Sequence, residues 1–558
     1  MGQNVKKIFF GLVVAVVVVG FVGWSNKIEI MLALVKFKTQ REYNVASNRE
    51  IRWQTGPSLP DGDKLEQAPN IIFIVLDDVG INDISTFGSG IARGRQKTPN
   101  IDALAAEGMI FNQAYAGNAT CAPSRGMMMT GRYPTRTGFE FTPFPGGQRL
   151  LTTIFNSLDS GLPPAVINEA AEDVALPFEE QGLPSSEVTI AEILKGKGYH
   201  TVHIGKWHMG RGKGMAPNDQ GFDESLLMHS GLYLPEDDPG VVNAKLDFDP
   251  IDTFLWARLR YSASFNDASN DHAFEPRGYL TDYWTEESVK VIKANKNRPF
   301  FLYLAHWGMH TPLQATREDF EAVGDIKPHR LRVYAAMMRA LDRSIGRIEE
   351  TLKAEGLEDN TMIILTNDNG APGYIGIPEV NKPYRGWKLT FFEGGLRVPM
   401  FVKWPAKIAA GSQVNEPVSH IDLLPTMAAA AGAVIPDGLE IDGVNLLPLA
   451  RGEAKLPDRP LFWQSSYYRS VRYKGWKLQV SDKPEKNWLY DLSNDPTERM
   501  NLAQENSEKL AELQNLIKVH AASGRRPLYP STLQAPVMID KALDQRFEEG
   551  DEYIYWPN

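Results

Sequence analysis

Cysteine is almost missing from this chain of 558 residues: Cys121 is the only one. A single cysteine cannot form an intramolecular disulfide, so a disulfide-stabilised scaffold is excluded. Positive charge is also in short supply, since 59 Lys and Arg face 69 Asp and Glu for a formal net charge of −10. Nucleic-acid-binding proteins carry a basic surface, so we expect no nucleic acid partner. The sequence shows no internal repeat and no His-rich zinc pattern, which argues against a solenoid and a structural zinc site.

The N-terminus carries a long uncharged run that is rich in valine. Lys6 and Lys7 precede Ile8 to Trp24, seventeen residues without charge. This length lies between a signal-peptide core and a membrane span. We therefore predict a signal peptide or membrane anchor over residues 1–26, with an uncleaved anchor favoured, followed by a linker over 27–68. If it is uncleaved, residues 8–24 provide contact with the membrane.

The cysteine content and the glycosylation sequon indicate the compartment to which the chain is exported. Exported eukaryotic proteins are often disulfide-bonded and glycosylated. Here one cysteine excludes an internal disulfide, and the only Asn-x-Ser/Thr sequon, Asn118-Ala119-Thr120, directly precedes Cys121. We expect an exported protein of the bacterial periplasm, anchored to the inner membrane by residues 8–24 if these are not cleaved.

Apolar, β-branched runs alternate with helical patterns over much of the chain. Continuous apolar runs are typical of parallel strands that are buried on both faces. Such runs occupy residues 70–76, 299–305, 361–366 and 398–402, and shorter strand-like runs occupy residues 109–114 and 201–204. The pattern predicts an α/β catalytic domain over residues 69–440, with a doubly wound, mostly parallel sheet flanked by helices. Segments near 139–184 and 210–277 lack the pattern and are predicted to be insertions.

The C-terminal part has a different pattern. From residue 461 to 490, short β-like runs are separated by turns, and an amphipathic helix is expected over Ser507 to His520. Neighbouring short strands with turns indicate an antiparallel sheet. We therefore predict a smaller α+β domain over residues 441–558, an antiparallel sheet packed with a helix.

Two acidic clusters follow predicted strands. Asp77 and Asp78 follow the run 70–76, and Asp368 and Asn369 follow the run 361–366. Either cluster alone is most simply a turn. Together, at the ends of strands that can be neighbours, they offer only oxygen ligands, which suit Ca²⁺, with Mg²⁺ possible.

Basic groups follow strands in the same way. Lys206 and His208 follow the run 201–204, and His310 follows the run 299–305. Arg125 and Lys388 lie in polar, glycine-containing stretches. Taken singly, each is most simply a surface or core residue. Together they can form the local basic pocket that an enzyme of net negative charge needs to attract an anionic ester.

These stretches carry a family resemblance. In order along the chain they are Cys121-Ala122-Pro123-Ser124-Arg125, Gly205-Lys206-Trp207-His208, His310-Thr311-Pro312 and Lys388 before Glu393-Gly394-Gly395-Leu396-Arg397-Val398-Pro399. They resemble the type I, formylglycine-dependent sulfatases of the alkaline phosphatase superfamily, which include the arylsulfatases. Several motifs in one order are far more specific than any one motif.

The resemblance implies a sulfuric ester hydrolase. It implies that a maturation enzyme converts Cys121 to formylglycine, and that the cation is held by Asp77, Asp78, Asp368, Asn369 and modified Cys121. One hydroxyl of the hydrated aldehyde then attacks sulfur. It further implies that Lys206, Lys388 and His310 hold the sulfate, that Arg125 orients the nucleophile, and that His208 removes a proton to release sulfate. Either Lys388 or His310 can protonate the leaving alcohol, and the substrate is a sulfated small molecule or carbohydrate.

Three alternatives remain at this stage. A phosphodiesterase or phosphonate monoester hydrolase of the same superfamily can share most of this apparatus. A catalytically inactive carbohydrate-binding relative would be expected to have lost some of the set. A thiol hydrolase that uses the Cys121 thiolate fits poorly with acidic neighbours.

Overall fold

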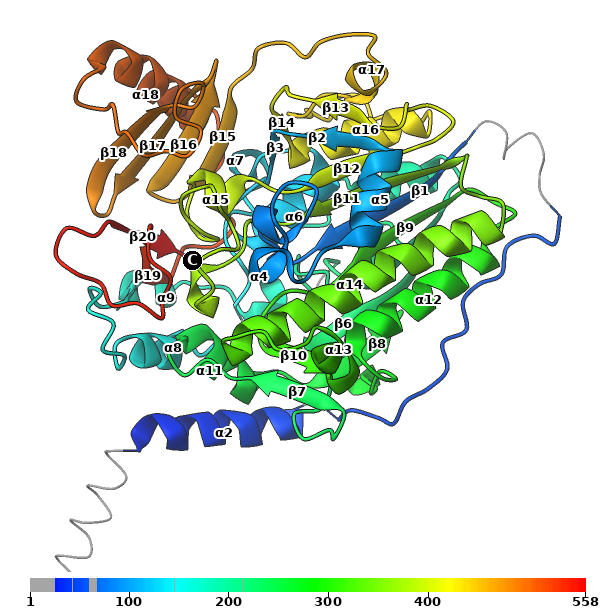
Figure 1. Ribbon diagram of the computed structural model, residues 1–558, viewed down its shortest axis with the longest axis horizontal. Coiled ribbons are helices and arrows are strands. Elements are labelled where there is room, and N and C mark those ends of the chain that lie inside the picture. Colours follow the sequence, from blue (N-terminus) through cyan, green and yellow to red (C-terminus); the bar gives the residue numbers. More distant parts are fainter. Residues whose placement is uncertain (1–25, 43, 60–67, 145, 213) are drawn as a thin grey trace, which may run out of the picture.

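The computed structural model (Figure 1) describes residues 26–42, 44–59, 68–144, 146–212 and 214–558. The predicted anchor over residues 8–24 lies outside this part of the chain. Within the described residues, no helix is both long enough and apolar enough to cross a membrane. The region predicted to be a linker contains a helix of sixteen residues, α2 (Lys27–Glu42).

A mixed sheet of nine strands organises the larger domain. Its five central strands, β11, β1, β9, β5 and β6, all run parallel. Antiparallel strands β12 and β8 flank this group. In sheet order the strands are β13 (Ser412–Val414), β2 (Met109–Phe111), β12 (Met400–Lys403), β11 (Thr361–Asn367), β1 (Asn70–Leu76), β9 (Phe300–Ala305), β5 (His200–Gly205), β6 (Glu224–Gly231) and β8 (Tyr261–Phe265).

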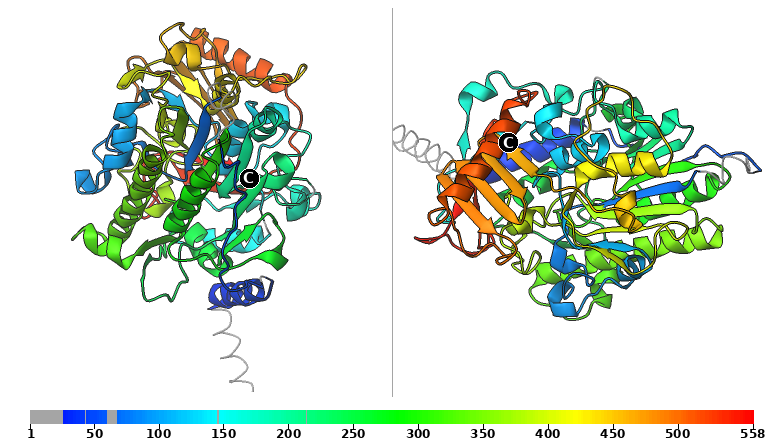
Figure 2. Two further views of the ribbon diagram at one scale, coloured as in Figure 1. Left: turned by 90° about the vertical axis from the view of Figure 1, so that its right-hand side faces the viewer. Right: turned by 90° about the horizontal axis from the view of Figure 1, so that it is seen from above.

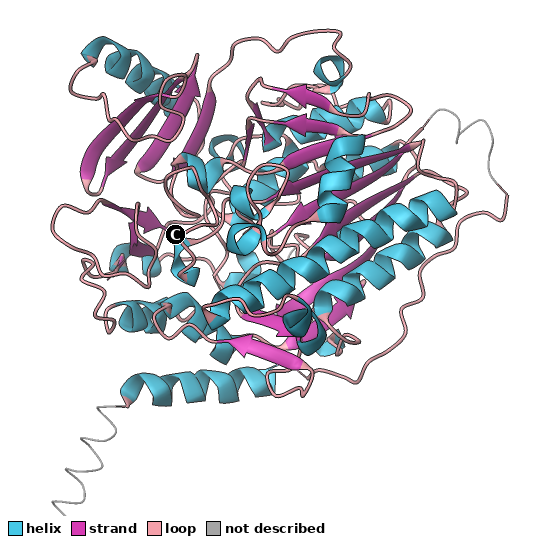
Figure 3. Ribbon diagram, viewed as in Figure 1, coloured by secondary structure: helices cyan, strands magenta, loops and turns pink. Residues whose placement is uncertain are grey.

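Helices cover both faces of this sheet (Figure 3). Every residue of β1 is buried, and successive residues belong to different hydrophobic clusters. Ile72 and Ile74 pack with the helices α5 (Pro99–Glu107), α12 (Leu280–Ala294) and α14 (His329–Ala354). Phe73 and Val75 pack with α6 (Cys121–Thr130), α10 (Ile190–Gly196) and α16 (Leu423–Ala430). The predicted doubly wound α/β fold is therefore confirmed.

The two segments predicted to be insertions contribute regular structure. Residues 210–277 supply β6 and the edge strand β8, together with β7 (Val241–Ala244) and α11 (Pro250–Arg258). Residues 139–184 supply α8 (Gln148–Phe155) and β4 (Val166–Ile167), which pairs with β19 (Leu533–Met538). These strands escape sequence analysis because they mix polar and apolar residues, as in Tyr-Ser-Ala-Ser-Phe of β8.

The predicted C-terminal domain is also present. Strands β15 (Leu461–Ser465), β16 (Tyr468–Tyr473), β17 (Trp476–Asp482) and β18 (Glu485–Asp491) form an antiparallel sheet. Helix α18 (Ser507–Ala522) packs on this sheet through Leu513 and Ile517 (Figure 2). The chain then returns to the larger domain, where β19 pairs with both β20 (Tyr553–Pro557) and β4.

The remaining short elements connect these parts. They are α4 (Ile91–Gly94), β3 (Ala114–Tyr115), α7 (Pro134–Thr137), α9 (Glu169–Glu172), β10 (Leu313–Thr316), α13 (Arg317–Ala322), α15 (Glu393–Leu396), β14 (Val418–Ser419) and α17 (Leu447–Ala450). Helix α15 bears on function because it follows the loop that carries Lys388.

Candidate active site

The polar residues singled out in the sequence meet at one edge of the sheet. Strands β11, β1, β9 and β5 are parallel neighbours, so their carboxyl ends lie side by side. Ligands of open α/β sheets bind at this edge. Four strands and two other segments supply the set: Asp77 and Asp78 after β1, Asp368 and Asn369 after β11, Lys206 and His208 after β5, His310 after β9, Cys121 and Arg125 on α6, and Lys388 before α15.

Buried oxygen atoms form the centre of this site. Asp77, Asp78, Asp368 and Cys121 each place one ligand atom within 4.8 Å of the others. Burial and the nearby carboxylate of Asp368 raise the pKa of Asp77 to about 7. A bound cation would offset this repulsion.

Asn369 gives a second indication of a cation. Its side-chain nitrogen donates hydrogen bonds to Asp78 Oδ1 (2.8 Å) and to the Gly370 carbonyl (3.0 Å). Its side-chain oxygen is buried and has no hydrogen-bond partner among the described residues. Buried oxygens are rarely left unpaired, so this atom is available to a metal ion. The residues present thus fit the divalent cation that the resemblance implies, with oxygen ligands of the type that Ca²⁺ and Mg²⁺ prefer.

Arg125 holds the carboxylates in position. Its fully buried guanidinium donates to Asp368 Oδ2 from Nε (3.0 Å) and Nη2 (2.8 Å), and to Asp77 Oδ2 from Nη2 (3.2 Å). It also donates to the Lys206 carbonyl (3.3 Å) and the Tyr303 hydroxyl (3.4 Å). The sequence motif suggests that Arg125 acts on residue 121, whereas its hydrogen bonds here go to the carboxylates of β1 and β11.

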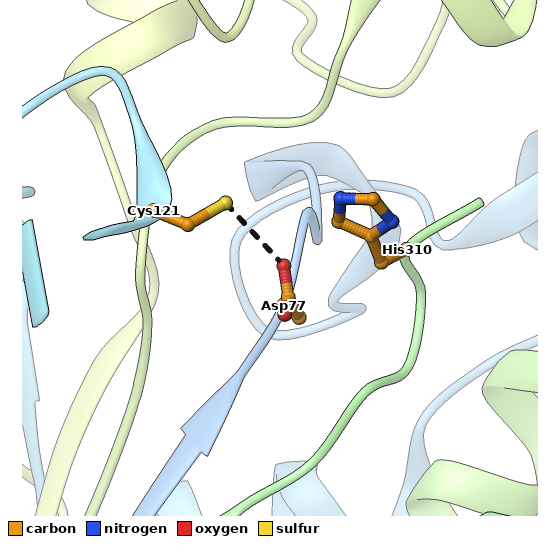
Figure 4. A group of neighbouring side chains, drawn as sticks. All are labelled: Asp77, Cys121 and His310. Atoms are coloured by element: carbon orange, nitrogen blue, oxygen red, sulfur yellow. Dashed lines mark hydrogen bonds between the residues drawn. The ribbon is translucent and has the colours of Figure 1, made fainter. Parts of the chain in front are cut away.

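Cys121 begins α6 and faces Asp77. Its Sγ lies 3.7 Å from Asp77 Oδ1, and His310 lies on the other side of Asp77 in Figure 4. Burial, reinforced by the Asp368 carboxylate, raises the pKa of the Cys121 thiol. The unmodified thiol therefore stays protonated at neutral pH and is a poor nucleophile. This argues against the thiol-hydrolase alternative.

Two lysines bring positive charge to the carboxylates. Lys206 Nζ donates to Asp77 Oδ2 at 2.6 Å, and Lys388 Nζ donates to Asp78 Oδ2 at 2.8 Å. Both lysines are buried. Although burial alone would lower the pKa of Lys388, Asp78 and its other neighbours raise it well above its usual value. Together with Arg125, these ammonium groups balance the three carboxylates of the site, so a bound cation would give it the positive charge that the chain as a whole, at −10, lacks.

Both histidines of the site are held neutral. Burial, together with Lys206, lowers the pKa of His208 well below its usual value. Burial, together with Lys388, does the same to His310. His310 Nδ1 donates to the Thr311 carbonyl (2.6 Å), which leaves Nε2 as an acceptor 3.7 Å from Asp78 Oδ2. A neutral imidazole can accept a proton but has little capacity to donate one.

Unusual backbone conformations occur at the same strand ends. Asp78 (φ 59°), His208 (φ 64°) and Leu389 (φ 78°) adopt the left-handed region, which is uncommon for residues other than glycine. Such conformations persist only where the surrounding structure imposes them, and they are concentrated at functional sites. Asp78 and His208 belong to the predicted site, and Leu389 directly follows Lys388.

A cavity of about 300 Å³ adjoins these groups. Cys121, Lys206, His208, His310 and Lys388 line it on one side. Its other walls are mostly apolar and come from β6, α8, α11 and the C-terminal strand β20, with the aromatic rings of Phe144, Phe178, Phe254, Trp307 and Trp556. A polar end with a larger apolar region is the usual character of a small-molecule site.

Three contributors to the site had not been singled out in the sequence. The Tyr374 hydroxyl donates to Asp78 Oδ2 (3.3 Å), and Tyr303 contacts Arg125. The Trp307 ring stacks on His310, with ring centroids 3.9 Å apart. Trp307 lies three residues before His310 in the sequence, so it could have been singled out together with that histidine. Tyr374 lies in a loop whose position depends on long-range packing, so no sequence signal marks it.

Comparisons with known proteins agree with this geometry. The sulfatase family model matches residues 69–433, and a model described as N-sulphoglucosamine sulphohydrolase, C-terminal, matches residues 386–523. Human N-acetylgalactosamine-6-sulfatase is 33% identical over 408 residues, covering 72% of this chain and 69% of the relative. Rat steryl-sulfatase is 29% identical, covering 77% of this chain and 78% of the relative.

Among solved structures, Ps i-CgsB in complex with k-i-k-neocarrahexaose superimposes with a TM-score of 0.67 and 30% identity. The match covers 83% of this chain and 95% of that one. Since the family model spans the larger domain, and a relative that is one-third identical is matched over more than two-thirds of its length, the chain belongs to the sulfatase family and is a sulfuric ester hydrolase.

Proposed function

We propose that the protein cleaves sulfate monoesters with a formylglycine that a maturation enzyme makes from Cys121. The observation that carries this proposal is the arrangement around Cys121. Lys206, Lys388, His208 and His310 line the same cavity as residue 121, while burial raises the pKa of the thiol and keeps it protonated at neutral pH. The hydrated aldehyde would supply a hydroxyl at this position, where a thiol cannot serve.

We propose Ca²⁺ as the cation, with Mg²⁺ as the alternative. Asp77, Asp78, Asp368, Asn369 and the modified residue 121 would hold it. When bound, such an ion supplies positive charge that stabilises anionic oxygens in the transition state. Its presence would also weaken the pairing of Lys206 with Asp77 and of Lys388 with Asp78, which frees both ammonium groups to bind sulfate.

The residues then divide the remaining work. Lys206 and Lys388 hold the sulfate oxygens, and stabilisation of developing charge by fixed donors is a large part of enzyme catalysis. His208 is neutral and can accept the proton whose removal releases sulfate. Of the two candidates for protonating the alcohol, Lys388 carries a proton in this site and His310 does not. The pairing with Asp78 raises the pKa of Lys388 and makes it a weak acid, whereas a bound cation would weaken that pairing and bring the pKa back toward its usual value. We assign Lys388 in that state as the proton donor and His310 as a group that binds sulfate or the leaving oxygen.

The substrate is a sulfated carbohydrate or small molecule. The name of the human relative specifies a sulfated amino sugar, and the Ps i-CgsB complex contains an oligosaccharide. Aromatic walls such as those formed by Phe144, Phe254 and Trp556 can stack against the apolar face of a sugar ring or a fused ring system. A panel of sulfate esters that differ only in the alcohol would identify the preferred class.

The decisive measurement concerns residue 121. Protein produced with a formylglycine-generating enzyme should release sulfate, and the peptide that spans residue 121 should show an aldehyde or its hydrate in place of the thiol. C121A, produced in the same way, should retain its fold and lose turnover. Full activity in protein that contains only the unmodified thiol would overturn the mechanism.

A phosphonate or phosphodiester hydrolase remains the second candidate from the sequence. The family model and the named relatives favour sulfate. Rates on sulfate and phosphate esters of one alcohol separate the two activities. A clear preference for phosphate would reassign the chemistry while leaving the site residues in place.

We also propose that the protein is exported to a bacterial periplasm, with residues 8–24 as an anchor in the inner membrane. The uncharged run in the sequence supports export, and the single cysteine together with the position of the Asn118 sequon supports a bacterial host.

A further inference from the structure

Helix α2 is covered by protein on one face only. Its residues Ile28, Leu32 and Val35 pack in a cluster with α8 and α11, which includes Leu151 and Phe254. Arg260 Nη2 donates to the Lys36 carbonyl (2.6 Å) and Lys36 Nζ pairs with Glu236 (2.8 Å). The helix is thus attached to the catalytic domain in a defined orientation, along the outside of α8 and α11 (Figures 1 and 2).

The opposite face of α2 is also apolar. Ile30, Met31, Leu34 and Phe37 are 47%, 38%, 61% and 52% exposed, and an α-helix brings them together on one side. Among the described residues these are four of ten exposed large hydrophobic side chains, and the other six lie at scattered positions. A helix that is apolar on both sides is expected to be covered on both sides.

Charge and chain position indicate what covers the outer face. By helical periodicity, Lys27, Lys38 and Arg41 share the side of Leu34. The helix contains four basic and two acidic residues in a chain of net charge −10. Only Ser25 and Asn26 separate its first residue from the uncharged run that ends at Trp24. Since a residue spans at most about 3.6 Å, α2 begins within about 11 Å of the end of that run.

We propose that the outer face of α2 lies on the surface of an anionic lipid bilayer, parallel to the membrane. Helices that bind in this way insert an apolar face by about 5–10 Å and present basic residues to lipid headgroups. A second copy of this chain is a poorer occupant, because four side chains on one helix offer far less than the roughly 1,000 Å² of a specific interface.

This orientation has a consequence for the catalytic cavity. Leu255 of α11 packs in the cluster that includes α2, and it also lines the cavity together with Phe254 and Arg258. The cavity wall formed by α11 is therefore separated from the bilayer by little more than α2 itself, a helix about 10 Å in diameter. The docking is independent of the sulfatase chemistry, because α2 contributes no residue to the site.

The single cysteine of the chain makes a direct test possible. Cys121 is buried, so a cysteine introduced on the surface is the only accessible thiol, and labelled wild type gives the background. The full chain would carry a polarity-sensitive fluorophore at L34C or F37C. Matched controls are Q40C, on the same helix but away from this face, and V434C, an exposed apolar position elsewhere. Vesicles of phosphatidylcholine and phosphatidylglycerol would contain a lipid-attached quencher.

The expected result is a blue shift and several-fold stronger quenching by the lipid quencher at L34C and F37C than at either control. A protein that binds the vesicles while both probes stay as water-accessible as V434C would overturn the proposal, and so would a protein that does not bind. If the probe at L34C is shielded from water in the absence of vesicles, and the shielding increases with protein concentration, a second copy covers this face. That result would also overturn the proposal. Sulfatase activity is recorded for every variant and should not change.

Discussion

Single residues in this site serve mainly to balance buried charge. Three carboxylates, Asp77, Asp78 and Asp368, are each paired with a buried cation: Lys206, Lys388 and Arg125 respectively. A buried ion pair contributes little net stability but is costly to break from one side. Substitutions at this site must therefore be chosen to conserve shape, so that a loss of activity is not a loss of folding.

Asp78→Asn meets this condition. Asn has the same shape and, like Asp, tolerates the left-handed conformation that Asp78 adopts (φ 59°), whereas Ala would be strained there. The substitution removes one anionic ligand, so we expect loss of bound metal and of turnover without a change in circular dichroism. Elemental analysis of purified protein is the measurement. Full metal occupancy in D78N would remove Asp78 from the ligand set.

Lys388→Met tests the assignment of the proton donor. A general acid typically contributes about 10²–10⁴-fold, and only when the leaving alcohol needs a proton. We expect K388M to lose this factor on sulfate esters of unactivated alcohols and to lose much less on nitrophenyl sulfate, whose leaving group departs as an anion. His310→Gln is the matched variant and should slow both substrates to a similar degree. Equal losses for K388M on both substrates would return the acid role to His310.

At the scale of elements, sequence analysis recovered the strands that position the site. β1, β9 and β11 are buried on both faces, so most of their residues form apolar runs that a sequence reveals directly. β5 is equally buried but contains Thr201 and His203, and it was predicted only as a short strand over residues 201–204. The polar residues that follow these strands were predicted to form one site, because the carboxyl ends of neighbouring parallel strands lie at the same edge of the sheet. β6 and β8 were not recognised because serines and a histidine interrupt their apolar residues. The pairing of β4 with β19 joins residues more than 360 positions apart, and no local signal specifies it.

The C-terminal domain is tied to the loop that carries Lys388. Lys477 of β17 pairs with Glu393 (2.8 Å) at the start of α15 and with Glu498 (3.0 Å), and all three side chains are buried. Arg385 similarly pairs with Asp540 (2.7 Å). These contacts fix the segment between residues 385 and 393 from both ends, and Lys388 lies within it.

Lys477→Met should therefore destabilise the protein by about 3–5 kcal/mol, because buried Glu498 loses its cation and Glu393 keeps only the more distant Arg397 (3.4 Å). Urea unfolding at neutral pH measures this difference. Lys518→Met, on the exposed side of α18, is the control and should change the unfolding free energy little. If K477M unfolds like the control, the pairing of the C-terminal domain with α15 contributes no stability, and the domain does not hold the Lys388 loop.

At the scale of the whole molecule, charge is distributed unevenly. The chain carries a net charge of −10, yet the cavity places Lys206 and Lys388 beside residue 121. Long-range attraction of a sulfated substrate is therefore absent, and binding depends on contact within the cavity.

The proposed anchor gives a prediction that concerns the intact protein. In a Gram-negative host, we expect the full chain in the membrane fraction, resistant to carbonate washing, with the catalytic domain digested by protease only after the outer membrane is opened. Val16→Arg places a charge near the middle of the run Ile8 to Trp24, at a cost of about 2.5–3.5 kcal/mol in a membrane span. This variant should shift protein toward the cytoplasm, whereas Val16→Leu should behave as wild type.

Recovery of the wild-type chain as soluble periplasmic protein lacking residues 1–25 would replace the anchor with a cleaved signal peptide. Export would then stand, and any remaining contact with the membrane would have to come from α2 alone.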